Sequence, residues 1–559
     1  MHIRCGFWKL FVIFLVVVSI SLLYQTASAK GIKVVDPKYK VVVLAKDTAM
    51  AGPNGANIGP DGALYVTHVS NTSISRIDLK TMKHSYFMNP DSGLFIPDDV
   101  TSDGKGQFFV SGLTAISGEV YRIDKNGLKT VIATGFPAAN GIQYNKKTGR
   151  LFVSECFFGN RVLEFDPTGA NPPKVVVAKD ILKVPEGFDF DPDTQDLIIP
   201  DMGTGKIMRV NPDTGDVKVI YEKFPHPVAL KIGPDKRAYI ADMHTGEVFR
   251  LSLDGQKVET LAKLSQGLDN LAITEDGRLF VTSWWEATVY EVSTDGSGKY
   301  KALFPVGVNQ IHGLAIKGKD VVVADNIMLR FMENGRYLQT KINAWGTTPG
   351  IPSPRGLANG PGSQYIWSNW FGGVLGIGDP KTGEFKVLTK GLSYPASMQM
   401  DKSESKLYVA EFGADQITEI TLPSGDKKVL AKDFSGPVSL ALIGETIYVG
   451  ETKSGRIIRL NPTTGKKEIF LAGGVGRPGA LGNDGAGNLL VLDGGGKRLL
   501  RVNTQNGAIT TIAQNLPVRY SVVGSYPYME LPVPMAVNER GDIYLTTMER
   551  GIILFKKKK

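Results

Sequence analysis

The sequence predicts an all-β protein built from two tandem six-bladed β-propellers of four-stranded blades. The main observation is a repeat: NGIQYNKKTGRLFVSE, from Asn140 to Glu155, reads as strand, tight turn and strand, and recognisable copies continue to the C-terminus. The copies lie about 42 residues apart, a usual length for a four-stranded blade. The 64 glycines and 31 prolines are placed at turns, as expected for many short strands. About twelve copies are present, and because one propeller has four to eight blades, they form two rings.

Each copy supplies the innermost strand of one blade, and the residue that begins this strand points toward the central channel. We call it the strand-start residue. In the first ring the strand-start residues are Asn54, Asp98, Asn140, Glu186, Val228 and Asp269, and in the second ring they are His312, Arg355, Ala396, Val438, Gly479 and Val533.

The expected domains are a first propeller over residues 30–305 and a second over residues 306–559, which ends in a lysine tail. A lone strand at 39–46 precedes the first repeat, and the last repeat lacks a fourth strand. If each propeller closes on itself, the strand at 39–46 completes the sixth blade and the strand at 301–304 completes the twelfth. In the alternative closure, 39–46 completes the second propeller, which makes the two domains inseparable. Both closures remove an exposed sheet edge.

Residues 1–29 are expected to be a secretory signal peptide. Arg4 and Lys9 precede the apolar run LFVIFLVVVSISLLY, and Ala27-Ser28-Ala29 supplies the small residues that suit signal peptidase. The alternative is an uncleaved membrane anchor, because the run is only slightly shorter than a spanning helix. No later stretch resembles a transmembrane helix. We therefore expect a secreted or periplasmic protein with no integral span after signal removal.

Charge and cysteine content exclude several classes of function. The formal net charge is +9, but Arg4, Lys9 and the terminal lysines at 556–559 contribute six of these charges, so the body is only slightly basic. No basic patch indicates a nucleic-acid partner. Cys5 lies in the signal segment and leaves Cys156 alone in the mature chain, which excludes an internal disulfide and thiolate zinc clusters.

The strand-start residues differ between the two rings. Five of the six in the first ring carry a carboxylate or a carboxamide, whereas those in the second ring are mixed and largely apolar or small. Oxygen ligands that converge from different blades are what a hard cation such as Ca²⁺ requires. Without a cation, converging carboxylates repel one another or take up protons. The candidate ligands of Ca²⁺ or another divalent cation are therefore Asn54, Asp98, Asn140, Glu186 and Asp269. The alternative is that these side chains accept backbone hydrogen bonds at the start of the strand.

A second polar layer comes from the ends of the second strands, which return to the same face. It comprises His68, Glu155, Asp201, Asp242 and Ser283 in the first ring, and Asp325, Asn369, Glu411, Glu451 and Asp493 in the second. Because this layer recurs in both rings, we expect it to cap turns or to pair with a nearby Arg or Lys.

Two histidines fall on the fifth blade at this face. His226 and His244 are the candidate catalytic residues, because a histidine beside a metal-bound carbonyl or water can act as general base. The alternative is that each is a loop residue with one hydrogen bond. Aromatic residues follow second strands at the same rim, which is typical of a small-molecule pocket. They are Phe157, Phe158, Trp284 and Trp285, while Trp345, Trp367 and Trp370 mark the eighth blade.

The units NGIQYNKKTGRLFVSE, EGFDFDPDTQDLIIPD and DNLAITEDGRLFVTSW resemble blades of the gluconolactonase and senescence-marker-protein family, with strictosidine synthase-like proteins as relatives. IGPDGALYVTH and LLRVN are also similar to NHL repeats and virginiamycin lyase-like propellers. The lactonase resemblance implies Ca²⁺ on the axis, held by a Glu, an Asn three blades later and an Asp on the next blade. Counted round the ring, these are Glu186, Asn54 and Asp98. In linear order, however, Glu186 comes fourth rather than first, so the ligand subset stays open.

The function that this resemblance implies is metal-assisted hydrolysis of an ester or lactone by a metal-dependent hydrolase. The ligand at the first-propeller face would then be a small-molecule substrate. A second hypothesis is a non-catalytic periplasmic or extracellular binding or scaffold propeller with a protein ligand, since fold does not imply function. A third is a virginiamycin lyase-like enzyme, for which the sequence offers no clear His-Glu pair.

Overall fold

The computed structural model describes residues 31–45, 49–113, 117–309, 311–325, 328–333, 336–343, 354–370, 372–518, 521–523, 529–531, 534–547 and 551–558. Within these ranges the regular structure is β-strand, apart from one 3-10 turn, η1 (Phe412–Ala414). The predicted all-β class is therefore confirmed. None of the described helical structure is long and apolar enough to cross a membrane. The predicted signal peptide, Trp345 and Val533 lie outside the described residues.

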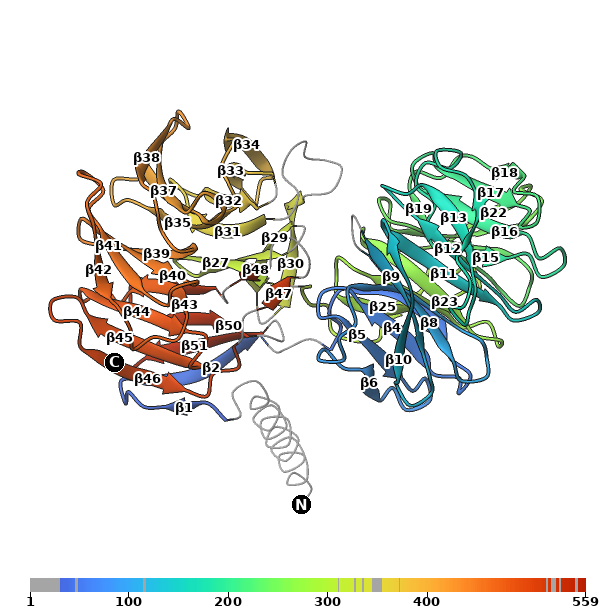
Figure 1. Cartoon of the computed structure of the whole chain (residues 1–559), viewed down its shortest axis with the longest axis horizontal. Coiled ribbons are helices and arrows are strands. Elements are labelled where there is room, and N and C mark those ends of the chain that lie inside the picture. Colours follow the sequence, from blue (N-terminus) through green and yellow to red (C-terminus); the bar gives the residue numbers. More distant parts are fainter. Residues whose placement is uncertain are drawn as a thin grey trace, which may run out of the picture. The chain divides into compact units, whose positions relative to one another are not determined.

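The chain divides into two compact units, one formed by residues 48–309 and the other by residues 1–47 together with 310–559. We call them the first and second propeller, and Figure 1 shows each as a ring of small sheets. In every sheet of the first propeller, four antiparallel strands follow one another in chain order from the channel outward. These strands are β3 (Pro53–Ile58), β4 (Leu64–His68), β5 (Ser73–Ile77) and β6 (His84–Met88); β7 (Pro97–Ser102), β8 (Phe108–Gly112), β9 (Gly118–Ile123) and β10 (Lys129–Phe136); β11 (Ala139–Asn145), β12 (Arg150–Glu155), β13 (Arg161–Phe165) and β14 (Lys174–Val177); β15 (Asp189–Phe190), β16 (Leu197–Asp201), β17 (Lys206–Val210) and β18 (Val217–Tyr221); β19 (Pro227–Ile232), β20 (Ala238–Asp242), β21 (Glu247–Leu251) and β22 (Val258–Lys263); and β23 (Leu268–Ile273), β24 (Leu279–Ser283), β25 (Thr288–Val292) and β26 (Tyr300–Ala302).

The second propeller has the same plan, except that two of its sheets receive a strand from the N-terminus. Its strands are β27 (Ile311–Lys317), β28 (Asp320–Asp325), β29 (Met328–Glu333) and β30 (Arg336–Asn343); β31 (Pro354–Asn359), β32 (Tyr365–Asn369), β33 (Val374–Asp379) and β34 (Glu384–Thr389); β35 (Pro395–Met400), β36 (Lys406–Glu411), β37 (Gln416–Thr421) and β38 (Lys427–Ala431); β39 (Pro437–Ile443), β40 (Thr446–Glu451), β41 (Ile457–Leu460) and β42 (Lys467–Leu471); β43 (Pro478–Asn483), β44 (Asn488–Asp493), β45 (Arg498–Asn503) and β46 (Ile509–Gln514) with β1 (Lys33–Val34); and β49 (Met535–Val537), β50 (Ile543–Thr546) and β51 (Ile552–Lys557) with β2 (Tyr39–Ala45). A short hairpin pairs β47 (Ser521–Val523) with β48 (Met529–Leu531).

The first propeller closes its ring by side-chain packing, without exchanging a strand. The outer strand of its last sheet is β26, which follows β25 in the sequence and pairs with it. The innermost strand of that sheet, β23, contacts β3 of the first sheet. Between these two sheets lies a buried cluster that includes Met50, Leu64, Phe280 and Val289. Similar clusters separate the other neighbouring sheets of this ring, so the core is a set of layers between blades.

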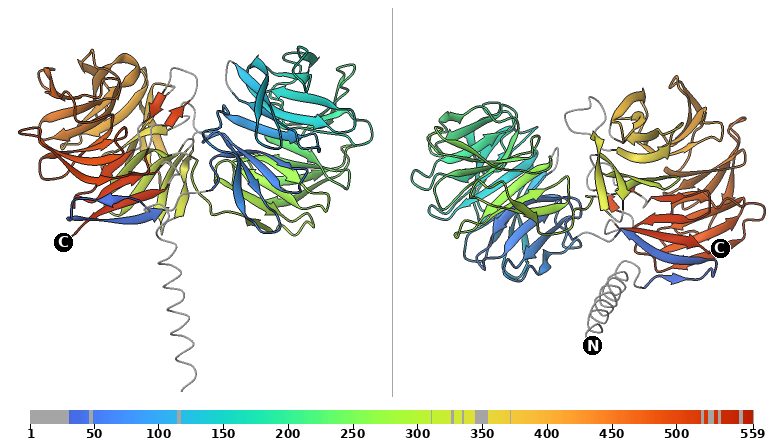
Figure 2. Two further views of the ribbon diagram at one scale, coloured as in Figure 1. Left: turned by 60° about the horizontal axis from the view of Figure 1, so that its bottom comes forward. Right: turned by 180° about the vertical axis from the view of Figure 1, so that it is seen from behind.

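The second propeller closes with the N-terminal strand. Strand β2 pairs antiparallel with β51, from Tyr39 opposite Lys557 to Ala45 opposite Ile552, and Figure 2 shows this N-terminal strand among the C-terminal strands. The closure in which 39–46 completes the sixth blade and 301–304 the twelfth is therefore wrong. Strand β2 joins the last sheet of the second propeller, as the alternative has it, and β26 joins the last sheet of the first. The expected range of the first propeller, 30–305, differs from the structure because residues 31–45 belong to the second.

The first residues of the lysine tail are exposed, and their backbone continues a strand. Lys556 and Lys557 belong to β51, where Lys556 lies opposite Lys40, and the amide of Lys558 donates to the Lys38 carbonyl at 2.8 Å. These backbone contacts occur because β2 supplies a partner strand, so the strand continues beyond the apolar residues at 552–555.

Candidate functional site

A β-bulge at the start of the innermost strands turns the strand-start residues toward the channel. In the first propeller the register shifts between Pro53 and Ala56, between Pro97 and Val100, and between Ala139 and Ile142, and the sixth sheet shows the same shift. A bulge leaves residues unpaired and re-aims their side chains. The strand-start residues that sequence analysis named as candidate ligands thus share one structural position, at the same end of their strands.

Glycines beside these residues allow neighbouring blades to approach closely. A Cβ at Gly141 would lie 2.7 Å from the Glu186 carbonyl oxygen, and one at Gly55 would lie 2.4 Å from the Asp99 Cα. The Asn-Gly pairs at 54–55 and 140–141 are therefore explained by packing between blades, because a side chain after the Asn would clash with the backbone of the neighbouring blade.

Hydroxyl groups of the second strands fix the same end of the ring. Ser154 Oγ donates to the Glu186 carbonyl at 3.1 Å, and Thr282 Oγ1 donates to the Asn54 carbonyl at 2.6 Å. Thr67 bonds the Asp98 carbonyl and Ser111 bonds the Asn140 carbonyl in the same way. Each bond joins one blade to the strand-start residue of the next, so the candidate ligands are held by a repeated contact around the ring.

Three acidic side chains gather at this end of the first channel in a poorly solvated environment. Asp98 is 1 % exposed, Glu186 is 3 % exposed and Asp269 is 9 % exposed. Burial, and then the charges of Asp269 and Asp99, raise the pKa of Asp98 well above its usual range. Burial, and then the charges of Asp98 and Asp269, do the same to the pKa of Glu186. Burial raises the pKa of Asp269 to about 7, with a further contribution from Asp99. The negative charges of these three side chains therefore repel one another.

Asn140 joins this group to Cys156, which sequence analysis did not select. The Asn140 side chain hydrogen-bonds both Glu186 and the Cys156 thiol. Cys156 is fully buried, and burial, followed by the charges of Glu186 and Asp98, raises its thiol pKa well above the usual range. The thiol is therefore protonated and unreactive at neutral pH. Its position directly after Glu155, at the end of a second strand, is the one sequence signal that points to the channel.

The residues fit a hard cation in chemistry but do not form a compact metal centre. In favour, all five candidate ligands offer oxygen atoms, and Asp98 Oδ1 is buried without a hydrogen-bond partner, as a ligand oxygen would be in the absence of its ion. Against, no three side chains of His, Cys, Asp or Glu in the described ranges lie close enough together to hold a metal ion. A cation here would depend on the amides of Asn54 and Asn140 as well as on carboxylates.

A further group of polar residues, which sequence analysis did not identify, lies deeper in the same channel. Lys231 is buried, and its Nζ donates to Gln143 Oε1 at 3.1 Å. Burial raises the pKa of both Asp99 and Asp189, and the Lys231 charge acts in the opposite direction on each. The far end of this channel opens into a cavity of about 690 Å³ lined in part by Lys231 and Asp189. Gln143, Asp189 and Lys231 each follow a strand-start residue by three positions, a spacing that could have revealed them.

The residues at the ends of the second strands mostly stabilise loops, as expected from their recurrence in both rings. Glu155 accepts hydrogen bonds from Arg161 at 2.6 and 2.9 Å, and Asp201 accepts from the amide of Val184 at 2.8 Å. Similar bonds to backbone amides or to a nearby Arg are made by Asp325, Asn369, Glu411, Glu451 and Asp493. His68 instead accepts from the Ala51 amide through Nδ1 at 3.1 Å and contacts Ser75 through Nε2.

Asp242 holds the loops that carry both candidate catalytic histidines. Its carboxylate accepts from the amide of His226 at 2.7 Å and from the amides of His244 and Thr245 at 3.1 and 2.9 Å. The two imidazoles lie against each other, with ring centroids 3.7 Å apart and ring planes tilted by 36°. Burial, and then the charge of His226, lower the pKa of His244, while His226 Nδ1 is buried without a hydrogen-bond partner. The structure thus brings the two histidines together, with one neutral imidazole at neutral pH.

Replacing Asp242 by Ala is expected to lower the free energy of unfolding of the first propeller by about 3 kcal/mol, because unpaired buried amides are costly. Urea denaturation followed by circular dichroism measures the change. The matched control is Asp213→Ala, at a side chain 76 % exposed in an ion pair with Arg150, for which little change is expected. Equal stability of the two variants would contradict this account of Asp242.

The aromatic residues at the rim divide into exposed and buried groups. Phe157 is 42 % exposed and Phe158 is 57 % exposed, whereas Trp285 is buried. Trp284 packs close to the backbone at Gly52, since its Nε1 would lie 3.1 Å from a Cβ at that glycine. In the second propeller Trp367 and Trp370 are both buried, and Trp370 packs against Tyr394 and Phe412, so packing is their observed role. Of these aromatic residues within the described ranges, Phe157 and Phe158 are the ones that are exposed.

One family model matches part of the chain, and several solved structures are similar to it. The SMP-30/gluconolactonase/LRE-like region matches residues 188–321, which run from the fourth blade of the first propeller to β28. Among solved structures, the nidogen/laminin complex is 23 % identical over 38 % of this chain and 80 % of that chain, with a TM-score of 0.34.

Two further structures are similar at lower identity. The tricorn protease is 13 % identical over 90 % of this chain and 61 % of that chain, with a TM-score of 0.35. A protein of Thermus thermophilus described as an oxidoreductase (glucose dehydrogenase) is 16 % identical over 44 % of this chain and 95 % of that chain, with a TM-score of 0.36. These values say nothing about activity. The chain is a β-propeller protein that resembles the SMP-30/gluconolactonase/LRE-like region in residues 188–321, as its repeat motifs predicted.

Proposed function

We propose that the first propeller binds a divalent cation at one end of its channel, and that Ca²⁺ is the favoured ion. The ligands would come from Asn54, Asp98, Asn140, Glu186 and Asp269. The observation that carries this proposal is the burial of three mutually repelling acidic groups in one ring, one of them with an unpartnered oxygen. A cation would relieve the repulsion between the carboxylates, and the Asp98 oxygen that has no hydrogen-bond partner would coordinate it. We further propose that the protein is exported, on the basis of the N-terminal sequence.

The activity that we propose for this site is hydrolysis of an ester or a lactone. A bound divalent cation supplies polarisation of a carbonyl and a lowered pKa of coordinated water. In this chain the adjacent His226 and His244 are the groups that would hold the proton, because the lowered pKa of His244 keeps its imidazole in the neutral form that can accept one. Phe157 and Phe158 would offer an apolar surface to the substrate.

A second candidate function is binding without catalysis. It is favoured by the burial of the ring: with Asp98 and Glu186 at most 3 % exposed, a cation held there would have little contact with a substrate. In that case the cation would stabilise the propeller, and a ligand would meet the rim.

The decisive experiment measures the metal content of the purified protein and Ca²⁺ binding by isothermal titration calorimetry after treatment with a chelator. We expect one bound cation in the wild type and binding weaker by at least about tenfold in Glu186→Gln and Asp98→Asn, because each loses a charged ligand. The matched controls are Glu222→Gln and Asp193→Asn, whose side chains are 60 % and 66 % exposed.

A protein that binds no divalent cation, or that binds Ca²⁺ equally well in all four variants, would refute the proposed site. A panel of esters and lactones, assayed with Ca²⁺ and with chelator, then separates the two functions. Turnover that requires Ca²⁺ and falls in His226→Asn supports the hydrolase, whereas a calcium-bound protein without turnover supports the binding function.

A further inference from the structure

The cavity of about 690 Å³ at the far end of the first propeller's channel is lined by one residue from each of the six innermost strands. Each of these residues follows a strand-start residue by three positions, and together they are Asn57, Thr101, Gln143, Asp189, Lys231 and Ala272. We call the first five, which are polar, the polar ring. The volume of the cavity is within the range of small-molecule pockets.

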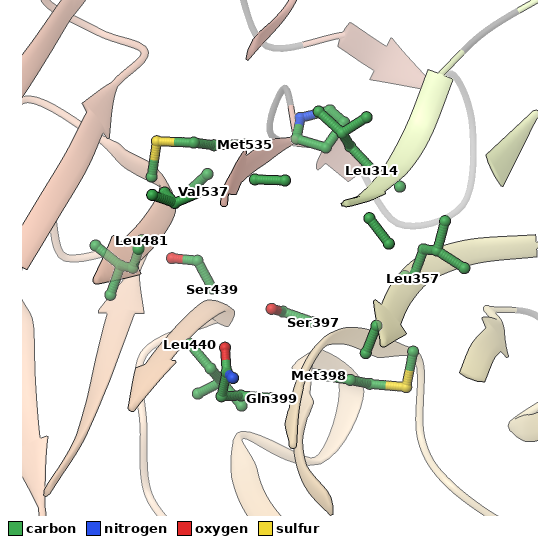
Figure 3. Close-up of a pocket in the computed structure, with 18 of the residues that line it drawn as sticks. Leu314, Leu357, Ser397, Met398, Gln399, Ser439, Leu440, Leu481, Met535 and Val537 are labelled. Carbon is green, nitrogen blue, oxygen red and sulfur yellow. The ribbon is translucent and has the colours of Figure 1, made fainter. Parts of the chain in front are cut away.

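The propeller fold does not require polar residues at these positions. The channel of the second propeller holds a cavity of about 330 Å³, and Figure 3 shows Gln399 at its wall. The six corresponding residues of that propeller are Ala315, Ala358, Gln399, Ala441, Gly482 and Ala536. Since the same strands form when five of the six residues are Ala or Gly, the polar ring is a special property of the first channel. We therefore examined its hydrogen bonds for signs of a ligand.

The polar ring balances its own charges. Gln143 lies between the two charged members: its Oε1 accepts from Lys231 Nζ at 3.1 Å, and its Nε2 donates to Asp189 Oδ1 at 3.2 Å. The Asp189 carboxylate also accepts from the amides of Phe190 and Ile232 at 2.8 and 2.9 Å. The other charged residues of the lining carry both signs as well, and they are Lys80, Lys146, Glu275, Asp276 and Arg278. This balance favours a neutral ligand over an ion.

The polar ring leaves hydrogen-bonding capacity of both kinds unused. Asn57 Oδ1 is buried and has no partner in the part of the chain that the structure describes, so it is a free acceptor. Lys231 is 4 % exposed, and its three protons face two described acceptors, Gln143 Oε1 and the Phe188 carbonyl at 3.5 Å. The Thr101 hydroxyl accepts from a backbone amide at 3.2 Å and keeps its own proton for a further bond. A ligand that both donates and accepts would complete these bonds.

From these observations we propose that this cavity binds a neutral polyol about the size of one sugar ring, such as a cyclitol or a pyranose. Its hydroxyl groups donate to Asn57 Oδ1 and accept from Lys231 Nζ and from the Thr101 hydroxyl, because a hydroxyl can do both. Partly buried apolar side chains of the lining contact its C–H groups, and they are Ile58, Leu79 and Ile273. The site is separate from the cation site proposed for the same propeller and does not depend on it.

The test is isothermal titration calorimetry of the full chain with myo-inositol and glucose, and with cyclohexanol as the comparison. Cyclohexanol has the carbon ring of myo-inositol but a single hydroxyl group. We expect one site, with both polyols bound at least about tenfold more tightly than cyclohexanol, because cyclohexanol leaves polar groups of the cavity unpaired. Absence of binding by both polyols, or equal binding of cyclohexanol, overturns the proposal. Tighter binding of inorganic phosphate than of either polyol would also overturn it, since that result indicates an anion site.

Asn57→Leu is the variant that best separates binding from a structural role. Because Asn57 Oδ1 has no partner to lose, this change is expected to leave the melting temperature of the ligand-free protein unchanged or higher. Binding of myo-inositol is expected to weaken at least about tenfold. The matched control is Gln399→Leu, at the corresponding position of the second propeller, for which binding should equal that of the wild type. A lower melting temperature with unchanged binding in Asn57→Leu would show that Asn57 is structural.

Two further variants test the donors of the polar ring. Lys231→Met and Thr101→Val each remove one donor and are expected to weaken binding of myo-inositol at least about tenfold. If Lys231→Met does not fold, because Gln143 loses its partner, Thr101→Val and the comparison of ligands still decide. Binding is expected to be equal with Ca²⁺ and with chelator, so the polyol site and the cation site can fail separately. Unchanged binding in both Asn57→Leu and Thr101→Val refutes the assignment.

Discussion

A chain that lacks residues 31–45 is expected to lose the folded second propeller and to keep the first. Strand β2 covers the edge of β51, and its Tyr39, Val41 and Val43 pack into the cluster formed by Leu490, Leu545, Phe555 and their neighbours. The ion pair between Asp36 and Arg501, at 2.7 Å, is lost as well. A fully buried apolar side chain contributes roughly 1.5–3 kcal/mol. Tyr39 is buried and Val41 and Val43 are partly buried, so their combined loss is comparable with the lower part of the stability of a domain, about 5–15 kcal/mol.

Differential scanning calorimetry measures this effect, since two propellers that unfold independently give two transitions. The deletion is expected to remove one transition and to leave the other at its temperature, while a separate chain of residues 48–309 shows only the surviving one. The matched control is Lys40→Glu in the full chain, at an exposed position of the same strand. Two unchanged transitions after the deletion would show that β2 is dispensable.

The stability of the cation-free first propeller is expected to rise as the pH falls through the pKa of Asp269. Because burial raises this pKa from 3.8 to about 7, the folded protein binds more protons than the unfolded chain between these values, and the free energy of unfolding therefore decreases as the pH increases. The penalty is complete above pH 7 and is on the order of 4 kcal/mol for this residue. Asp98 and Glu186 shift in the same direction.

Melting temperatures recorded with chelator and with Ca²⁺ check this prediction. In Asp269→Asn the stability gained on acidification should shrink by the contribution of one group, whereas the exposed Asp216→Asn should behave as the wild type. Added Ca²⁺ should stabilise the wild type at about pH 8 and have little effect at about pH 5, because protons compete with the cation. If, with chelator present, the melting temperature changes between the two pH values by the same amount in the wild type and in Asp269→Asn, the raised pKa of Asp269 is contradicted.

The repeat predicted the parts of this structure that depend on local sequence. Turn residues and alternating strands recur in every blade, so positions such as Asn140 and Glu155 could be assigned from one unit and carried to the others. The contrast between the two rings also came from single positions and located the acidic group of the first channel. Its spacing could not be predicted, because the distance between Asp98 and Asp269 depends on the diameter of the ring.

Features that depend on distant partners were not predicted. The strand at 39–45 has the same alternating pattern whichever sheet it joins, and only the pairing of Tyr39 with Lys557 selects the second propeller. Cys156 enters the channel because the turn after Glu155 places it beside Asn140, and a lone cysteine gives no pattern to read. The hollow second channel follows from the combined volumes of six positions, none of which is informative alone.

The pairing of β2 with β51 sets the order in which the protein can be completed. Synthesis runs from the N-terminus at about 5–20 residues per second, so β2 precedes its partner by a time on the order of a minute. The first propeller, whose strands are contiguous, can fold within that interval, but the second has its N-terminal and C-terminal strands at opposite ends of the synthesis. A chain that stops even a few residues before Ile552 therefore carries one finished propeller and one open ring with an exposed edge, a form that quality control can distinguish from the complete protein.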